Sequence, residues 1–137
     1  MQYKLNILTA DREFYSGMVD SLTFSAVDGQ MCILAGHSPL VCALDIGQIK
    51  IVDDNGEHIC ANSDGHVEIF PEEVTVFAQS CEWPEEIDVA RAKASEERAK
   101  EELERHKSRM VYEHSRITMA RAMARLRVSQ YKGKYNN

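Results

Sequence analysis

Long apolar runs are missing from this chain of 137 residues. Charged residues interrupt every apolar stretch well before the roughly 18 residues that a membrane-spanning helix requires. The first 20 residues also contain five charged side chains, at Lys4, Asp11, Arg12, Glu13 and Asp20. We therefore expect neither a membrane span nor a secretory signal. The length allows one or two small domains and excludes a large enzyme.

Sequence patterns typical of metal sites and of catalysis are also missing. The five histidines show no i,i+4 pairing and no cysteine pair nearby, which argues against a zinc site. The chain has neither a Walker A loop nor a nucleophile elbow, so we expect neither nucleotide turnover nor serine hydrolysis. The four cysteines have no C-x-x-C spacing and are Cys32, Cys42, Cys60 and Cys81. We interpret them as reduced, buried thiols of a cytoplasmic protein.

Residues 1–84 combine turn signals with the alternating pattern of short strands. Leu22 and Phe24 are predicted to face the core from one side of a half-buried strand. The opposite side would carry Val19, Ser21 and Thr23. Asn55-Gly56 predicts a tight hairpin between residues 48–52 and 58–61. We expect six to ten strands in an antiparallel β-sandwich or flattened barrel.

Proline is absent after Pro84, and Gly133 is the only glycine in that part of the chain. Residues 89–107 consist mainly of strong helix formers, which predicts a first helix over about residues 88–106. Its apolar stripe is thin and consists of Val89, Ala92, Ala99 and Leu103. Residues 85–137 are therefore predicted to form a second, helical domain.

A second helix is predicted to begin at Ser108 or Ser115. Its apolar residues recur at steps of three and four and are Tyr112, Met119, Ala120, Met123, Leu126 and Tyr131. We expect the two helices to form an antiparallel hairpin with its turn near residues 105–109, while one continuous helix is also compatible with the sequence. Small apolar residues bury little area, so we expect the hairpin to be only marginally stable without a docking surface. A marginally stable element can occupy two positions.

Acidic residues are missing from residues 115–137, which carry six Lys or Arg side chains. Residues 1–84 show the opposite imbalance, with three basic and thirteen acidic residues, whereas residues 85–137 hold thirteen basic and nine acidic ones. The C-terminal segment is therefore predicted to contact an anion. The alternative is a solvated helix face, although such faces usually mix both signs.

The run IDVARA, residues 87–92, places a carboxylate and a guanidinium on one helix face, at Asp88 and Arg91. Arg98 follows two turns later, and Arg121 and Arg125 form an i,i+4 pair. Guanidinium groups bind phosphate oxygens bidentately, so this set is a candidate polyphosphate site. The alternatives are a helix cap for Asp88, pairs within the helix, and contact of the last two arginines with an acidic protein surface.

Several segments resemble, in order along the chain, those of the epsilon subunits of bacterial F-type ATP synthases. They are GQMCILAGHSPL (29–40), ALDIG (43–47), DGHVEI (64–69), VTVFA (74–78), IDVARA (87–92) and LRV (126–128). The resemblance implies a non-catalytic rotor-stalk subunit whose sandwich couples the gamma subunit to the ring of c subunits. It also implies a C-terminal hairpin that senses ATP as a regulatory ligand, needs no metal, and restrains ATP hydrolysis.

The resemblance also implies particular site residues. The ATP site would consist of Glu82, Ile87, Asp88, Arg91, Ala92, Arg98, Arg121 and Arg125. Within it, Glu82 and Asp88 would contact adenine or ribose. Gln30 and His37 would lie at the interface with the rotor, where Gln30 replaces an acidic residue and Ala35 a proline that are common in relatives.

Partners and location follow from the same resemblance. The expected partners are gamma, the c ring and, through the hairpin, the catalytic β subunits, with no nucleic acid. The chain would be peripheral to the cytoplasmic face of the cell membrane. The alternative is a purely structural coupling subunit whose arginines dock on acidic catalytic subunits without nucleotide. A free-standing nucleotide-binding module and a small hydrolase are further possibilities.

Overall fold

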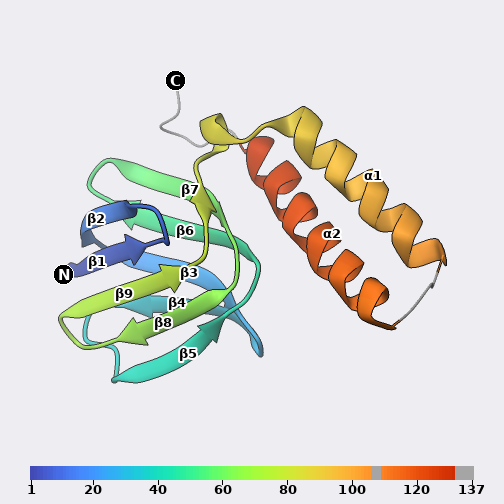
Figure 1. Cartoon of the computed structure of the whole chain (residues 1–137). Helices are drawn as coiled ribbons and strands as arrows, with labels where there is room; N and C mark the ends of the chain where they lie inside the picture. The colour runs from blue at the N-terminus through green and yellow to red at the C-terminus, as the bar shows by residue number, and fades with distance from the viewer. Residues whose placement is uncertain (106–108, 132–137) are drawn as a thin grey trace.

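The computed structural model describes residues 1–105 and 109–131. Within these ranges the first domain consists of ten short strands. They are β1 (Tyr3–Leu8), β2 (Glu13–Val19), β3 (Ser21–Ala26), β4 (Gly29–Leu34), β5 (Leu40–Leu44), β6 (Gly47–Asp53), β7 (Gly56–Asn62), β8 (Gly65–Ile69), β9 (Glu73–Ala78) and β10 (Cys81–Glu82). The predicted sandwich with a following pair of helices is confirmed (Figure 1).

The strands form one sheet that curls into a nearly closed sandwich. Its order is β10-β7-β6-β3-β5-β8-β9-β1-β2, with β4 paired to β3 outside this path. One pair departs from the antiparallel prediction, because β1 runs parallel to β9. These two strands are far apart in the sequence, so no hairpin dictates their relative direction.

Alternation places the expected side chains in the core. Leu22 and Phe24 are fully buried, whereas Ser21 and Thr23 on the other face of β3 remain partly exposed. Val19 was predicted to share that outer face, and this is wrong: it ends β2 and is fully buried. Val19 belongs to the preceding strand, so its side chain does not follow the alternation of β3.

The predicted hairpin at Asn55-Gly56 joins β6 to β7. Asp53 pairs with Gly56, so Asp54 and Asn55 form the turn and Gly56 begins the next strand. Gly56 has a φ of 112°, a conformation that favours glycine. The turn therefore lies one residue before the predicted dipeptide.

All four cysteines are free, as expected, but only Cys60 and Cys81 are buried. Cys32 is exposed and Cys42 is partly exposed, so the prediction of burial is wrong for this pair. Cys32 lies on the outward face of β4, which pairs with β3 outside the main strand order.

Two separate helices follow a single 3-10 turn, η1 (Pro84–Glu86). They are α1 (Val89–Arg105) and α2 (Arg109–Ser129). The helices run antiparallel, and α2 packs against β7 and β6 of the sandwich (Figure 1). A single continuous helix is thereby excluded, while residues 106–108 of the predicted turn lie outside the described residues. Neither helix, within the described ranges, is long and apolar enough to cross a membrane.

The apolar stripe predicted for the second helix is only partly correct, since Met119, Leu126 and Tyr131 are partly buried. Ala120 and Met123 are exposed, and the side chain of Tyr112 lies outside those described. Among the α2 side chains that the structure describes, the buried ones are Ser115, Ala122, Ala124 and Val128. Because α2 contacts both α1 and the sandwich, its buried surface is wider than one stripe and consists of small side chains.

Candidate functional site

A cleft of about 390 Å³ lies where the sandwich, η1 and both helices meet. Its walls are formed by Glu82, Glu86, Asp88, Arg91, Ala92, Ser95, Arg98 and Arg125. Six of these residues belong to the ATP site predicted from the resemblance. Glu86 and Ser95 do not, and no motif in the sequence indicated them.

The first turn of α1 positions one side of the cleft. Asp88 Oδ1 accepts a hydrogen bond from the backbone N–H of Arg91 at 3.0 Å, so this carboxylate caps the helix. The helical spacing then brings Ser95 and Arg98 to the same wall. Arg98 Nε lies 3.4 Å from the carbonyl oxygen of Ala94. Among the described side chains, neither Arg91 nor Arg98 takes part in an ion pair.

Arg125 closes the cleft from α2. Its Nε donates a hydrogen bond to Glu82 Oε1 at 2.6 Å, and both side chains are partly buried. A charge-assisted bond of this kind is shorter and stronger than a neutral one. It therefore holds α2 against β10 and places a guanidinium opposite α1.

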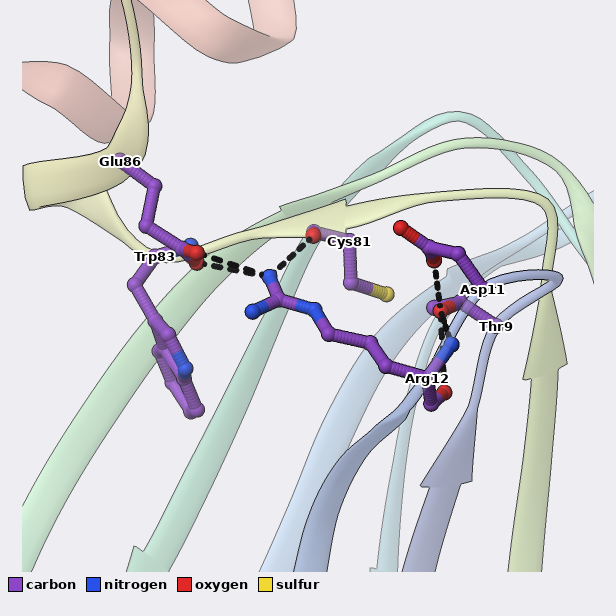
Figure 2. A network of polar contacts seen from close by, with 6 residues as sticks. All are labelled: Thr9, Asp11, Arg12, Cys81, Trp83 and Glu86. Atoms are coloured by element: carbon purple, nitrogen blue, oxygen red, sulfur yellow. Dashed lines mark hydrogen bonds and ion pairs between the residues drawn. The ribbon is translucent and has the colours of Figure 1, made fainter.

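Glu86 is held from outside the cleft by Arg12, which lies in the turn between β1 and β2. Arg12 Nη2 lies 2.9 Å from both carboxylate oxygens of Glu86 and 3.4 Å from the carbonyl oxygen of Cys81 (Figure 2). Glu86 Oε1 also accepts from the backbone N–H of Trp83 at 2.9 Å. The hydrogen bond from Arg12, followed by that from Trp83, lowers the pKa of Glu86 below its usual value.

Two predicted ATP-site residues do not line this cleft. Ile87 is buried in a small cluster with Ile59, Ala61 and Val128, where it packs the hairpin against the sandwich. Arg121 lies 3.2 Å from Asp64 Oδ1 and lines a smaller cavity that Arg125 and Glu82 also border. Arg121 is thus adjacent to the cleft but directed toward the sandwich.

The two residues predicted at the rotor interface lie in different settings. Gln30 is exposed on β4 and lines a groove of about 500 Å³ together with Val27 and Leu40. His37 lies in the turn between β4 and β5, where its Nδ1 is 2.8 Å from the carbonyl oxygen of Ser38. Leu34 on β4, Leu40 and Val41 on β5, and Val27 in the turn before β4 expose large apolar side chains. Such a surface is typical of protein contact.

No group of three or more acidic, histidine or cysteine side chains in the described ranges is arranged to hold a metal ion. The fold and the cleft together define a β-sandwich module with a docked helical hairpin. Residues 2–84 match the family described as the ATP synthase delta/epsilon chain, beta-sandwich domain, and residues 85–130 match its long alpha-helix domain. The chain belongs to this ATP synthase delta/epsilon family.

Bacterial relatives agree with this assignment. The ATP synthase epsilon chain of Ruminiclostridium cellulolyticum is 42% identical over 123 residues, which are 89% of this chain and 91% of that relative. The epsilon chain of Halalkalibacterium halodurans is 34% identical over 126 residues, covering 91% and 95% of the two chains. Epsilon chains are stalk subunits and not the catalytic ones, so the predicted family and the prediction of a non-catalytic subunit are confirmed.

Solved structures show the same fold. A chain in the cryo-EM structure of the Euglena gracilis mitochondrial ATP synthase, OSCP/F1/c-ring, superposes with a TM-score of 0.83 at 20% identity, covering 95% of this chain and 82% of that one. A chain in the cryo-EM structure of the central stalk and c-ring of the Tetrahymena thermophila mitochondrial ATP synthase gives a TM-score of 0.63 at 10% identity, covering 95% of this chain and 98% of that one. At these identities the likeness establishes the architecture alone.

Proposed function

We propose that the chain couples gamma to the c ring through its sandwich, and that its hairpin senses ATP and restrains ATP hydrolysis. One observation carries the sensing part. The cleft brings together six of the eight residues predicted to bind ATP, although they come from β10, α1 and α2 and from the connection before α1.

The chemistry of the cleft suits a nucleotide. Its volume of about 390 Å³ falls within the usual range for small-molecule sites. Arg91 and Arg98 would bind phosphate oxygens, each charge-assisted bond contributing about 1.5 to 3 kcal/mol. The carboxylates of Glu82 and Asp88 are acceptors for an adenine amino group or a ribose hydroxyl. With no Walker A loop in the sequence, ATP is a ligand and not a substrate.

The position of the cleft suggests how ATP would act. Since both helices and β10 form its walls, bound ATP stabilises the hairpin in its docked position. A ligand shifts such an equilibrium only by binding one position better than the other. At low ATP the hairpin would leave the sandwich, and the exposed basic side chains of α2, including Arg116 and Arg127, would contact acidic surfaces of the catalytic β subunits.

The sandwich supplies the coupling surface. The groove beside Gln30 and the exposed side chains of Val41 and Leu34 would contact gamma and the c ring. In this role the chain is peripheral to the cytoplasmic face of the membrane and attached through the complex. It binds no nucleic acid.

Calorimetric titration of the purified chain with ATP, with ADP as the comparison, tests the sensing function. We expect saturable one-site binding of ATP without release of phosphate. Absence of binding, in a chain that still couples the reconstituted enzyme, would leave the purely structural role. In the reconstituted enzyme, a chain truncated after Glu86 is expected to keep coupling and to release ATP hydrolysis at low ATP.

A further inference from the structure

The charges that line the cleft cancel. Its walls carry three carboxylates, on Glu82, Glu86 and Asp88, and three guanidinium groups, on Arg91, Arg98 and Arg125. A polyphosphate requires an excess of positive charge, because each uncompensated carboxylate repels it and competes for the arginines. The lining residues alone do not supply that excess.

A fourth guanidinium lies directly behind one wall. Arg12 contacts both carboxylate oxygens of Glu86 at 2.9 Å but is not itself part of the cleft surface. Counting it, four positive charges oppose three negative ones. The Cys81 carbonyl fixes the position of Arg12 further (Figure 2). The Phe14 ring also contacts it, with the ring centroid 5.0 Å from the guanidinium carbon.

We infer that Arg12 is a positioning residue for the nucleotide. It compensates the negative charge of Glu86 and holds this side chain toward the sandwich, so that Arg91 and Arg98 remain available to bind phosphate. The inference rests on the proposed ATP site. It adds a residue of the β1–β2 turn, 74 positions from its partner in sequence, to a site otherwise built from the C-terminal half of the chain.

Calorimetry on the full chain tests this role. Arg12→Gln is expected to weaken ATP binding about tenfold, because it leaves the Glu86 carboxylate without a countercharge at the phosphate site. The loss should be smaller for ADP and smallest for AMP, following ligand charge. Arg116→Gln is the matched control: it removes the same charge from α2, where Arg116 pairs with Glu113 at 3.6 Å and does not line the cleft. This control should bind ATP like wild type.

Variants of Glu86 separate electrostatics from mere structural support. If Arg12 acts through charge, Glu86→Gln binds ATP about threefold more tightly than wild type, and Arg12→Gln with Glu86→Gln restores the affinity lost in the single Arg12 variant. If the pair only supports the structure, Glu86→Gln weakens ATP binding and the double variant binds as weakly as Arg12→Gln. Either result would overturn the inference. The Glu86→Gln measurement is decisive even if Arg12→Gln does not fold.

The two levels of proposal fail differently. If the wild-type protein does not bind ATP, the proposed sensing function is itself wrong. If wild type and Arg12→Gln bind ATP with the same affinity, only the proposed role of Arg12 is wrong. Raising the salt concentration should narrow the difference between wild type and Arg12→Gln, since Arg12 and Glu86 are partly exposed.

Discussion

Arg125 of α2 and Glu82 of β10, 43 residues apart, are joined by a 2.6 Å charge-assisted hydrogen bond at the edge of the cleft. The same guanidinium lines the cleft and attaches the hairpin to the sandwich. Arg91 lines the cleft as well but makes no ion pair with any described side chain. The two arginines therefore have separable contributions to ligand binding and to stability.

Alanine variants of these arginines should show that separation. Arg91→Ala is expected to weaken ATP binding at least about tenfold, the loss of one charge-assisted contact, with no change in the urea midpoint of the ligand-free protein. Arg125→Ala should lose similar affinity and also about 1 kcal/mol of stability, because it leaves Glu82 without its partner. Equal ATP binding by wild type and both variants would instead make the arginines a protein-docking surface.

Gly65 at the start of β8 allows close approach of the neighbouring strand. A Cβ atom there would lie 1.8 Å from the backbone carbonyl oxygen of Phe77, which cannot move without disturbing β9. Gly65→Ala is expected to cost at least about 2 kcal/mol in urea unfolding. Gly17→Ala is the control, since its Cβ would meet only the side chain of Tyr15, at 3.3 Å. Similar stability of both variants would contradict this account.

Asp53 should contribute stability that depends on pH. Burial raises its pKa, but hydrogen bonds from the Tyr15 hydroxyl, the His58 ring and the Asn55 N–H outweigh burial and leave the pKa below its usual value. An aspartate whose pKa is lower in the folded state stabilises the fold at pH values above its unfolded-state pKa of about 3.9. This stabilisation is lost as the pH falls through the folded-state pKa.

Asp53→Asn should therefore be less stable than wild type by about 1 to 2 kcal/mol at pH 7, with the difference shrinking below about pH 4. Urea unfolding at several pH values measures it. Asp54→Asn removes the adjacent carboxylate, which is exposed and accepts one hydrogen bond from Gln2, and should stay within about 0.5 kcal/mol of wild type at pH 7. A difference for Asp53→Asn that is constant with pH would exclude the charged carboxylate as its source.

Local patterns in the sequence predicted the local parts of the fold. The alternation around Leu22 and Phe24, the hairpin turn just before Gly56 and the cap at Asp88 each depend on residues a few positions apart, and the structure contains all three. The stripe predicted for α2 was wrong at Ala120 and Met123 because steps of three and four fit more than one helix face. Which face is buried depends on where the sandwich and α1 lie.

Helical spacing indicated Asp88, Arg91 and Arg98 as candidate site residues, whereas Glu82 and Ala92 were supplied only by the resemblance. Asp88 and Arg91 share a helical turn, but the contact of Glu82 with Arg125 depends on how the hairpin docks. The pair of Arg12 and Glu86 has no sequence signature, since any of several acidic residues could have met that arginine. Ile87 lies inside the matching motif, yet the structure places it in a packing cluster.

The sandwich is expected to fold without the hairpin, provided that the connector is kept. Trp83 stacks on Phe14 with ring centroids 4.4 Å apart, and Glu86 pairs with Arg12, so residues 83–86 pack on the first domain although they follow its last strand. A chain ending at Glu86 should therefore give a cooperative β-type melt, with the fluorescence of its single tryptophan still that of a packed ring.

A chain ending at Glu82 provides the comparison. It lacks both the aromatic stacking and the ion pair, and its free energy of unfolding should be lower by about 2 kcal/mol or more. Truncating a fully buried tryptophan costs about 3 to 5 kcal/mol, and Trp83 is only partly buried. Both chains expose Ile59 and Ala61, which α2 covers in the full protein. Their exposure therefore does not contribute to the difference in stability between the two chains. Equal melts would show that the connector does not stabilise the sandwich. A chain ending at Glu86 without a cooperative melt would show that the hairpin is part of the core.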